Sequence, residues 1–217
     1  MLAKSFQTAA LAFAFLGAFS GASLAKETME WKFTLRGDTL VYDTLSDAPD
    51  GEDEISTKDV DIMRDMLRAN REIRILELNS DGGSVWAGEE MARIVIDFEL
   101  DTIVSGECFS SCVTIFLGGK SRRMMLGSKI GFHQNSWSPK STESYYEKWR
   151  ENEKWETPFD FASWVYDDTQ IEVAEDLTYM IERGVDAAFA IKTKGVRNDD
   201  EWYPSRLELV QAGVLRD

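Results

Sequence analysis

Apolar and polar residues alternate with two different periods in the first half of the chain. Residues 31–45 alternate at every second position on either side of Gly37, a pattern typical of two short strands joined by a tight turn. Apolar residues then recur every three or four positions over residues 60–67, which predicts a helix that begins near Ser56. The apolar run over residues 73–78 predicts the next strand.

The alternation of strand and helix continues through the middle of the chain. Residues 85–98 have helical spacing, residues 101–107 form the next predicted strand, and residues 110–117 form a short helix that a glycine pair ends. Residues 130–134 form a further predicted strand. Short strands and helices in this order predict an α/β fold with parallel strands, whose functional groups gather at the carboxyl ends of the strands.

Residues 136–183 differ from this pattern, because they are dense in Trp, Tyr, Phe, Glu and Lys. We expect a helical, aromatic-rich insertion or lobe over residues 136–195. Exposed aromatic residues of this density mark an interface or a lid, although they can also cover the core of their own domain. The tryptophans concerned are Trp137, Trp149, Trp155 and Trp164.

The first 25 residues predict export. Lys4 precedes an apolar run of small residues, and the Ser-Leu-Ala sequence that ends at Ala25 suits cleavage, which together form the pattern of a secretory signal peptide. The alternative is an uncleaved anchor, although the run is short for a spanning helix of about 20 residues. We expect a periplasmic or secreted protein with one domain over residues 26–217.

The formal net charge of −15 argues against a nucleic-acid partner, because an acidic surface repels phosphates and no basic stripe offsets it. The chain contains one histidine and two cysteines, which excludes a metal site built from several imidazoles or from a cysteine cluster. We expect neither a bound metal nor a cofactor.

Ser110 lies where a predicted strand ends and a predicted helix begins. Backbone N–H groups at such a place have no partner in the helix, and the helix dipole favours negative charge, so a serine oxygen or the oxyanion that it creates is stabilised. The alternative is an ordinary helix N-cap, worth about 1 kcal/mol. Ser111 is as good a cap, so position alone does not separate a nucleophile from a cap.

Two further features lie at the ends of predicted strands. Gly82 and Gly83 let the backbone approach another group closely and can direct an N–H group at a developing oxyanion, although a glycine pair also suits an ordinary turn. His133 is the only histidine and lies at or near the end of its strand. Imidazole is the natural general base near neutral pH, but a single histidine is more often a packed or solvent-facing residue.

Taken together, these runs resemble the proteolytic subunit of Clp protease and its relatives. The resemblance is carried by LNSDGGSVWAG, GECFSSC, FLGG and IGFHQ, in this order, and it returns in the tail LELVQAGVLRD. It is closest to exported Clp-like proteins in which cysteines flank the serine. It implies a ClpP/crotonase-like α/β core of repeated strand–helix units and leaves residues 136–195 unmatched.

The resemblance also implies a serine peptidase site. By position, Ser110 falls on the nucleophile, and His133 falls on the general base. The N–H groups of Gly82 or Gly83 and of Ser111 fall on the oxyanion donors. In such a site the histidine takes the serine proton, an acid orients the imidazole and the two N–H groups receive the oxyanion.

The acid of the family precedes the final helix, in a segment that corresponds here to NDDEWYP. Asp200 is the preferred candidate, and Asp199 and Glu201 are the alternatives. The resemblance thus implies that a carboxylate of this segment contacts His133.

Cys108 and Cys112 allow more than one state. Export favours a disulfide, but residues four apart in a regular helix have Cβ atoms about 5–6 Å apart, beyond the roughly 3.5–4.5 Å that a disulfide needs. Because Cys108 precedes the helix, the chain can bend toward Cys112. The alternatives are two small buried side chains, or a cysteine nucleophile, which needs an exposed thiolate.

We interpret the chain as an exported Clp-like serine hydrolase, most readily a peptidase, that acts on a peptide or protein substrate. An inactive scaffold or binding protein with the same fold is the alternative, and an acyl-CoA-handling enzyme of the wider crotonase-like superfamily is a third reading, which export disfavours. The relatives form rings or trimers, so we also consider a homo-oligomer. No ATP-driven unfoldase is expected outside the cytoplasm.

Overall fold

The computed structural model describes residues 30–217, and the predicted signal peptide lies outside them. Its sheet follows the order β1-β2-β3-β4-β5, and β6 also pairs with β4. β1 runs antiparallel to β2, and the other neighbouring strands are parallel. The strands are β1 (Phe33–Arg36), β2 (Thr39–Asp43), β3 (Ile75–Ser80), β4 (Asp101–Phe109), β5 (Arg122–Met124) and β6 (Lys129–Gly131).

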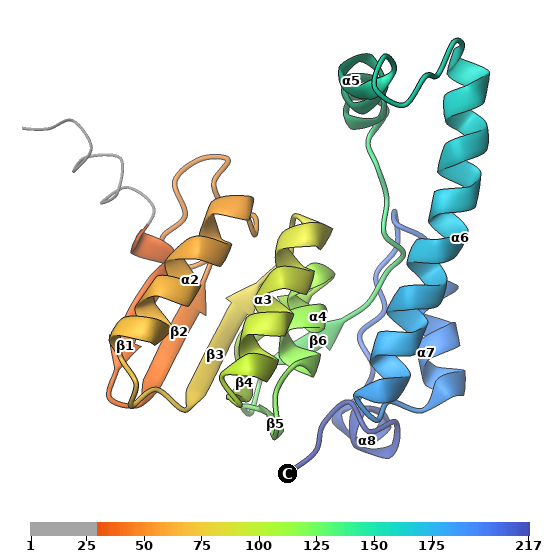
Figure 1. The fold of residues 1–217 in the computed structure, drawn as a ribbon. Coiled ribbons are helices and arrows are strands. Elements are labelled where there is room, and N and C mark those ends of the chain that lie inside the picture. Colours follow the sequence, from red (N-terminus) through yellow and green to blue (C-terminus); the bar gives the residue numbers. More distant parts are fainter. Residues whose placement is uncertain (1–29) are drawn as a thin grey trace, which may run out of the picture.

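Helices connect the parallel strands and lie together against the sheet (Figure 1). Their apolar faces pack on the strands, with Met63 and Leu67 from α2 and Met91 and Val95 from α3 completely or almost completely buried. This arrangement confirms the α/β core that the alternating pattern predicts. The helices of this half are the short 3₁₀ helix η1 (Glu30–Lys32), α2 (Thr57–Ala69), α3 (Val85–Asp97) and α4 (Ser111–Leu117).

β5 is a strand that the apolar pattern does not predict, because its sequence is Arg-Arg-Met. Arg122 is nevertheless 1% exposed, and its guanidinium donates hydrogen bonds to the carbonyls of Leu117, Gly213 and Val214. Burial lowers the pKa of Arg122 to about 10. A charged residue thus fastens the C-terminal segment to the core.

The second half of the described chain is helical (Figure 1). The C-terminal end of α6 is fastened to α4, because the Tyr179 hydroxyl donates to the Thr114 carbonyl at 2.8 Å and Arg183 Nε donates to the Leu117 carbonyl at 2.9 Å. From this attachment α6 extends past the sheet, and α5 lies beside its N-terminal end (Figure 1). These helices are α5 (Pro139–Trp149), α6 (Pro158–Glu182), α7 (Ala187–Lys194) and α8 (Arg206–Gln211).

We call residues 137–170, which comprise α5 and the first half of α6, the arm. Its aromatic rings pack on one another, as Tyr145 does on Trp164 at 5.7 Å between ring centroids. Only Trp155 and Phe161 are buried there, whereas Phe159 is 83% exposed and Tyr166 is 70% exposed. The arm therefore has a small aromatic cluster of its own. No helix among residues 30–217 is long and apolar enough to cross a membrane.

Candidate active site

Ser110 occupies a sharp turn between the end of β4 and the start of α4. Its backbone has φ 56° and ψ −129°, a left-handed conformation that residues with a Cβ rarely adopt. Strain of this kind is typically worth about 1–3 kcal/mol and persists only where the surrounding structure imposes it. The Ser110 side chain makes no capping hydrogen bond to α4, so it does not serve as the N-cap that its position allows.

His133 faces this serine, since its Nε2 lies 2.7 Å from Ser110 Oγ. The two residues meet because β6 pairs with β4, with Gly131 opposite Phe109, and each functional residue follows shortly after its strand. The imidazole stacks on the Phe109 ring, with centroids 4.6 Å apart. Strand pairing and stacking together fix the position of the imidazole.

The other ring nitrogen of His133 faces a backbone carbonyl. Nδ1 lies 3.4 Å from the carbonyl oxygen of Asn198. When Nδ1 carries the proton and donates it to this carbonyl, Nε2 is free to accept the Ser110 proton, which is the tautomer that a general base needs.

The structure does not bring the predicted acids to His133. The Asp200 carboxylate accepts from the N–H of Glu201 at 2.9 Å, and Asp199 pairs with Arg197 at 2.9 Å. The chain there bends back on itself, since the Asp200 N–H donates to the Arg197 carbonyl at 3.0 Å. This bend presents the Asn198 carbonyl to the imidazole and leaves Asp199, Asp200 and Glu201 exposed.

We call Gly82 and Gly83 the glycine turn, and this turn lies directly beside Ser110. A Cβ on Gly82 would lie 2.8 Å from Ser110 Cβ and 3.1 Å from Ser111 N, and a Cβ on Gly83 would lie 2.5 Å from the backbone of Ile55. Both glycines have positive φ, 99° and 144°. Only glycine fits this close approach at such angles.

Of the predicted oxyanion donors, two have free N–H groups. Gly82 N–H donates to Ser80 Oγ at 3.2 Å and is therefore occupied. Within residues 30–217, the N–H groups of Gly83 and Ser111 donate no hydrogen bond. Ser111 directly follows Ser110, and Gly83 directly follows Gly82, whose backbone closely approaches Ser110. Both N–H groups are therefore candidate oxyanion donors.

Residues 54 and 55 hold the glycine turn through backbone hydrogen bonds and connect it to a buried lysine. Ile55 N–H donates to the Gly82 carbonyl at 2.7 Å, and Ser84 N–H donates to the Ile55 carbonyl at 2.9 Å. The neighbouring Glu54 carbonyl accepts from Lys32 Nζ at 2.7 Å.

Lys32 in turn pairs with Asp59 at 3.1 Å, and the two side chains are 3% and 0% exposed. Asp59 also accepts from the Tyr42 hydroxyl at 2.6 Å and from the Ser56 N–H at 2.8 Å. Burial is the main cause that raises the pKa of Tyr42, so this hydroxyl stays protonated and donates. Asp59 Oδ2 thus takes part in all three contacts, whereas the buried Oδ1 has no hydrogen-bond partner among residues 30–217. Through Lys32 and the Glu54 carbonyl, the ion pair positions the segment that contacts Gly82 and Gly83.

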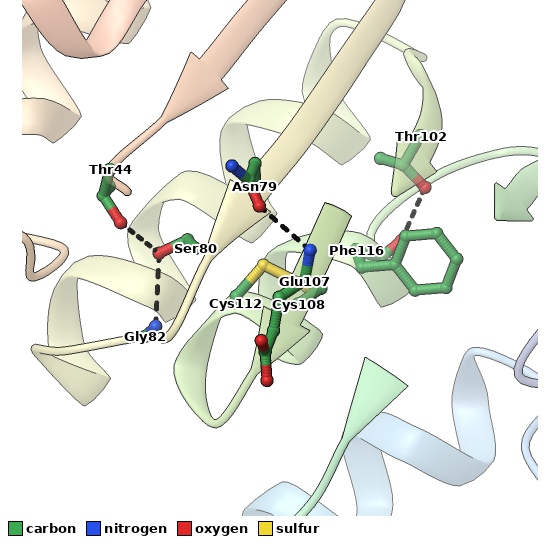
Figure 2. The surroundings of a disulfide bond; sticks show 9 residues. All are labelled: Thr44, Asn79, Ser80, Gly82, Thr102, Glu107, Cys108, Cys112 and Phe116. Atoms are coloured by element: carbon green, nitrogen blue, oxygen red, sulfur yellow. Dashed lines mark hydrogen bonds between the residues drawn. A yellow bond between two sulfur atoms is a disulfide. The ribbon is translucent and has the colours of Figure 1, made fainter. Parts of the chain in front are cut away.

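The two cysteines form a disulfide that encloses Ser110 (Figure 2). The Cα atoms of Cys108 and Cys112 are 5.3 Å apart, and both side chains are fully buried. Of the states that the sequence leaves open, the structure has the disulfide, and residues 30–217 contain no free cysteine. The bridge is possible because Cys108 is the penultimate residue of β4, outside the helix that contains Cys112.

Hydrogen bonds from β3 complete the surroundings of the disulfide. Asn79 Oδ1 accepts from the Glu107 N–H at 2.9 Å, at a shift in the register between β3 and β4 (Figure 2). Ser80 Oγ binds both the Thr44 hydroxyl and the Gly82 N–H. Side chains at the end of β3 therefore connect the nucleophile strand with the glycine turn.

A narrow cavity of about 40 Å³ opens beside Ser110 and His133. Val113, Leu117, Phe132 and Met180 supply its apolar wall, and Glu89, Asp176 and Lys194 supply its charges. It adjoins a wider cavity of about 370 Å³ along α6, with which it shares Asn135, Asp176 and Lys194. A third cavity, of about 500 Å³, runs between Gly83–Trp86 and Ser136–Ser138 beneath the arm. Ser110 thus lines the smallest of three adjoining cavities, which we call the cleft.

Sequence reasoning missed several groups of this site. The Asn198 carbonyl is a backbone group, and no local motif marks it. The Lys32–Asp59 pair acts on the site through the Glu54 carbonyl, a contact that no local motif marks either. Glu89, Asp176 and Lys194 lie on helices, where charge usually indicates a solvated face. Among residues 30–217, no group of three or more His, Cys, Asp and Glu residues could hold a metal ion.

Solved structures that are similar to this chain include two of ClpP1. A point mutant of ClpP1 from Listeria monocytogenes matches with a TM-score of 0.56 at 15% identity, covering 88% of this chain and 93% of that chain. ClpP1 from the same organism matches with the same score and coverage at 16% identity. The chain has a ClpP-like fold. No protein-family model and no curated protein matches the sequence.

The ClpP-like fold confirms the resemblance that the motifs carry. The identity of 15–16% shows the fold alone, so the chemistry has to be argued from the residues. The match covers most of the chain, including parts of the helical half for which the sequence shows no resemblance.

Proposed function

We propose that the protein is an exported serine hydrolase, most readily a peptidase, whose nucleophile is Ser110. The contact of 2.7 Å between Ser110 Oγ and His133 Nε2, at a serine held in a strained turn, carries the proposal. A helix cap needs neither the strain nor the imidazole. The strained strand-to-helix turn displays the serine oxygen, as nucleophile turns do in other hydrolases.

The reaction would proceed by acyl transfer. His133 Nε2 takes the proton of Ser110 as Oγ attacks the carbonyl carbon of the substrate, and the N–H groups of Gly83 and Ser111 stabilise the oxyanion. The C–N bond then breaks, and the imidazolium gives its proton to the leaving amine. A water molecule, deprotonated by His133, hydrolyses the acyl-enzyme and restores Ser110.

The position of the substrate follows from the cleft. An extended peptide would lie along Gly83–Trp86, opposite Ser136–Ser138, since these segments face each other across the cavity beneath the arm. The arm then covers the peptide, as a lid would. A homo-oligomer in which copies meet through exposed arm residues such as Phe159 is compatible with this arrangement.

Export rests on the signal-like residues 1–25 together with the disulfide. Disulfides persist in oxidising compartments and are rare in the cytosol. The bridge between Cys108 and Cys112 supports a periplasmic or secreted location, where neither acyl-CoA nor ATP-driven unfoldases are expected.

A fluorophosphonate probe tests the nucleophile, because it forms an Oγ–P bond with an activated serine and releases fluoride. We expect the probe to label the mature protein at Ser110. Ser110→Ala and His133→Ala should abolish labelling without opening a large cavity. Ser111→Ala is the matched control, because it keeps the backbone N–H and should still be labelled.

Two outcomes would contradict this assignment. Labelling that disappears in Ser111→Ala but persists in Ser110→Ala would move the nucleophile by one residue. A folded wild-type protein that no probe labels would favour the inactive scaffold, for which the exposed position of Asp200 is the supporting observation.

The third member of the site is tested in the same assay. With the Asn198 carbonyl at His133 Nδ1, we expect Asp199→Asn, Asp200→Asn and Glu201→Gln to react at nearly the wild-type rate. Loss of labelling in Asp200→Asn alone would show that the loop rearranges in the reacting state and that Asp200 orients the imidazole.

A further inference from the structure

The narrow cavity beside Ser110 has an unusual combination of an apolar wall and carboxylates. Its volume is about 40 Å³, and it shares Asn135, Asp176 and Lys194 with the adjoining cavity of about 370 Å³. A long, thin side chain can pass through a narrow apolar section and place its end in a wider one, whereas a branched or aromatic side chain fills only the entrance. Lysine and arginine have such shapes, with an apolar stem and a charged end.

Negative charge predominates along this path. Among the described residues that line the three cavities of the cleft, four are carboxylates and one is an ammonium group: Glu89, Asp168, Glu172 and Asp176 against Lys194. Lys194 is engaged by Asp176 in an ion pair. Glu172 accepts a hydrogen bond from the Asn135 amide, which leaves its charge in place. The path therefore attracts a cation.

Glu89 is the other carboxylate of the narrow cavity, and its ion pair is longer and more exposed than that of Asp176. Its nearest cation is Arg93 at 3.8 Å, which is 61% exposed and also pairs with Glu90. Burial is the largest cause that raises the pKa of Glu89; Arg93 opposes it, and repulsion from Glu172, Asp176 and Glu175 adds to it, so that the pKa lies above its ordinary value. The cleft therefore holds Glu89 in surroundings where a cation would stabilise its ionised form.

A second observation concerns a residue that lines the same cavity. Ser111 lines it, is 5% exposed, and its hydroxyl oxygen is buried without a hydrogen-bond partner among residues 30–217. A buried polar group without a partner costs about 1–3 kcal/mol, so such groups are normally satisfied. The missing partner fits a polar group brought by the substrate, and an ammonium or guanidinium group can donate to a hydroxyl oxygen.

We propose that the cavity beside Ser110 selects lysine or arginine as the residue whose carbonyl group is attacked. This inference rests on the proposed serine hydrolase function and adds the chemistry of its substrate. Glu89 and Asp176 are the specificity-determining carboxylates. An acidic side chain would meet repulsion there, and an apolar side chain would shield Glu89 from water without offering a counter-charge.

Peptidyl diphenyl phosphonates test the preference, because the side chain next to phosphorus occupies the cavity while Ser110 Oγ bonds to phosphorus and phenoxide leaves. Three probes differ only in that side chain, which is that of lysine, leucine or glutamate. We expect the lysine probe to inactivate the enzyme at least ten times faster than the leucine probe, and the glutamate probe to react most slowly. The rates are measured by intact mass on the mature protein.

Variants locate the source of the preference. Glu89→Gln and Asp176→Asn should each reduce the ratio of lysine to leucine rates by about tenfold, which equals about 1.4 kcal/mol. Asp97→Asn is the matched control, since Asp97 is an exposed carboxylate of the same helix α3 and lines none of the three cavities. Lys194→Met should increase the ratio, because it frees Asp176.

The two hypotheses fail in different ways. If the fluorophosphonate labels Ser110 but the three phosphonates react equally fast, or the leucine probe reacts fastest, the cationic specificity is wrong. The proposed hydrolase function then still stands. A ratio that Glu89→Gln, Asp176→Asn and Lys194→Met all leave unchanged overturns the assigned residues. No reaction with any probe overturns both proposals.

Discussion

The sheet core and the arm bury their aromatic residues to very different extents. In the core Tyr42 and Phe116 are completely buried, and strands, helices and a disulfide surround Ser110. In the arm only Trp155 and Phe161 are buried, and α5 has no buried residue. Stability against local opening follows burial, so the core should open rarely and the arm often. Ser110 thus belongs to the well-packed part, whereas the weakly packed arm lines part of a neighbouring cavity of the cleft.

The first prediction concerns the buried ion pair between Lys32 and Asp59 in the core. Asp59→Ala leaves the Lys32 ammonium buried without its counter-charge and removes the acceptor of Tyr42. We expect the free energy of unfolding, measured by urea denaturation, to fall by about 3–5 kcal/mol. Asp61→Ala on the same helix removes an exposed ion pair and should change it by less than about 0.5 kcal/mol. Similar values for both variants would contradict the structural role of Asp59.

The second prediction concerns the aromatic cluster of the arm. Phe161→Ala removes a buried ring, a change that costs about 3–5 kcal/mol where it opens a cavity. We expect this loss to appear as faster hydrogen exchange over residues 137–170, with exchange in the sheet unchanged. Phe159→Ala, two residues earlier and largely exposed, is the control and should change neither. Faster exchange in the sheet as well would show that arm and core unfold as one unit.

The third concerns the disulfide, which belongs to the core but closes a short loop. Its separation of four residues gives a stabilisation of about 2 kcal/mol in the chain-entropy model. Reduction should lower the melting temperature and slow the labelling of Ser110, because the turn loses its constraint. A Cys108→Ala, Cys112→Ala double variant should behave like the reduced protein and be insensitive to reductant. Unchanged labelling after complete reduction would assign the bridge to stability alone.

The smallest effect concerns the strain at Ser110. Ser110→Gly relieves a strain of about 1–3 kcal/mol but raises the entropy of the unfolded chain, which costs about 0.5–1 kcal/mol. We expect a net gain of about 1 kcal/mol over Ser110→Ala, which keeps the strain, in paired thermal unfolding experiments. Both variants lose the nucleophile. A glycine variant no more stable than the alanine variant would show that the turn is unstrained.

Local patterns account for what the sequence predicts well. Strands and helices of the core follow from the periods of apolar residues, and the placement of Ser110 and His133 near each other follows from motifs at strand ends. The helical character of residues 136–195 follows from composition, whereas the boundaries of α5 and α6 depend on the capping residues Ser138 and Thr157. These features need only neighbours in the chain.

Contacts between distant segments account for what the sequence does not reveal. The carbonyl at His133 comes from Asn198, 65 residues away, and its selection over Asp200 depends on how one loop bends. Asp59 has the position of a capping residue, and nothing in the sequence pairs it with Lys32. The apolar pattern does not predict β5, because the buried residue of this strand is Arg122. The hydrogen-bond partners of Arg122 lie mainly in the C-terminal tail.

The burial of Lys32 has a consequence for proteolytic maturation. Removal of residues up to Ala25 leaves Lys32 in the chain, so the ion pair with Asp59 and the bond to the Glu54 carbonyl persist. Cleavage only a few residues further, after Lys32, would remove the ammonium group, and the segment that fixes the glycine turn would lose its anchor. A truncation that keeps Lys32 should therefore leave this support of the glycine turn in place, whereas one that passes Lys32 should remove it.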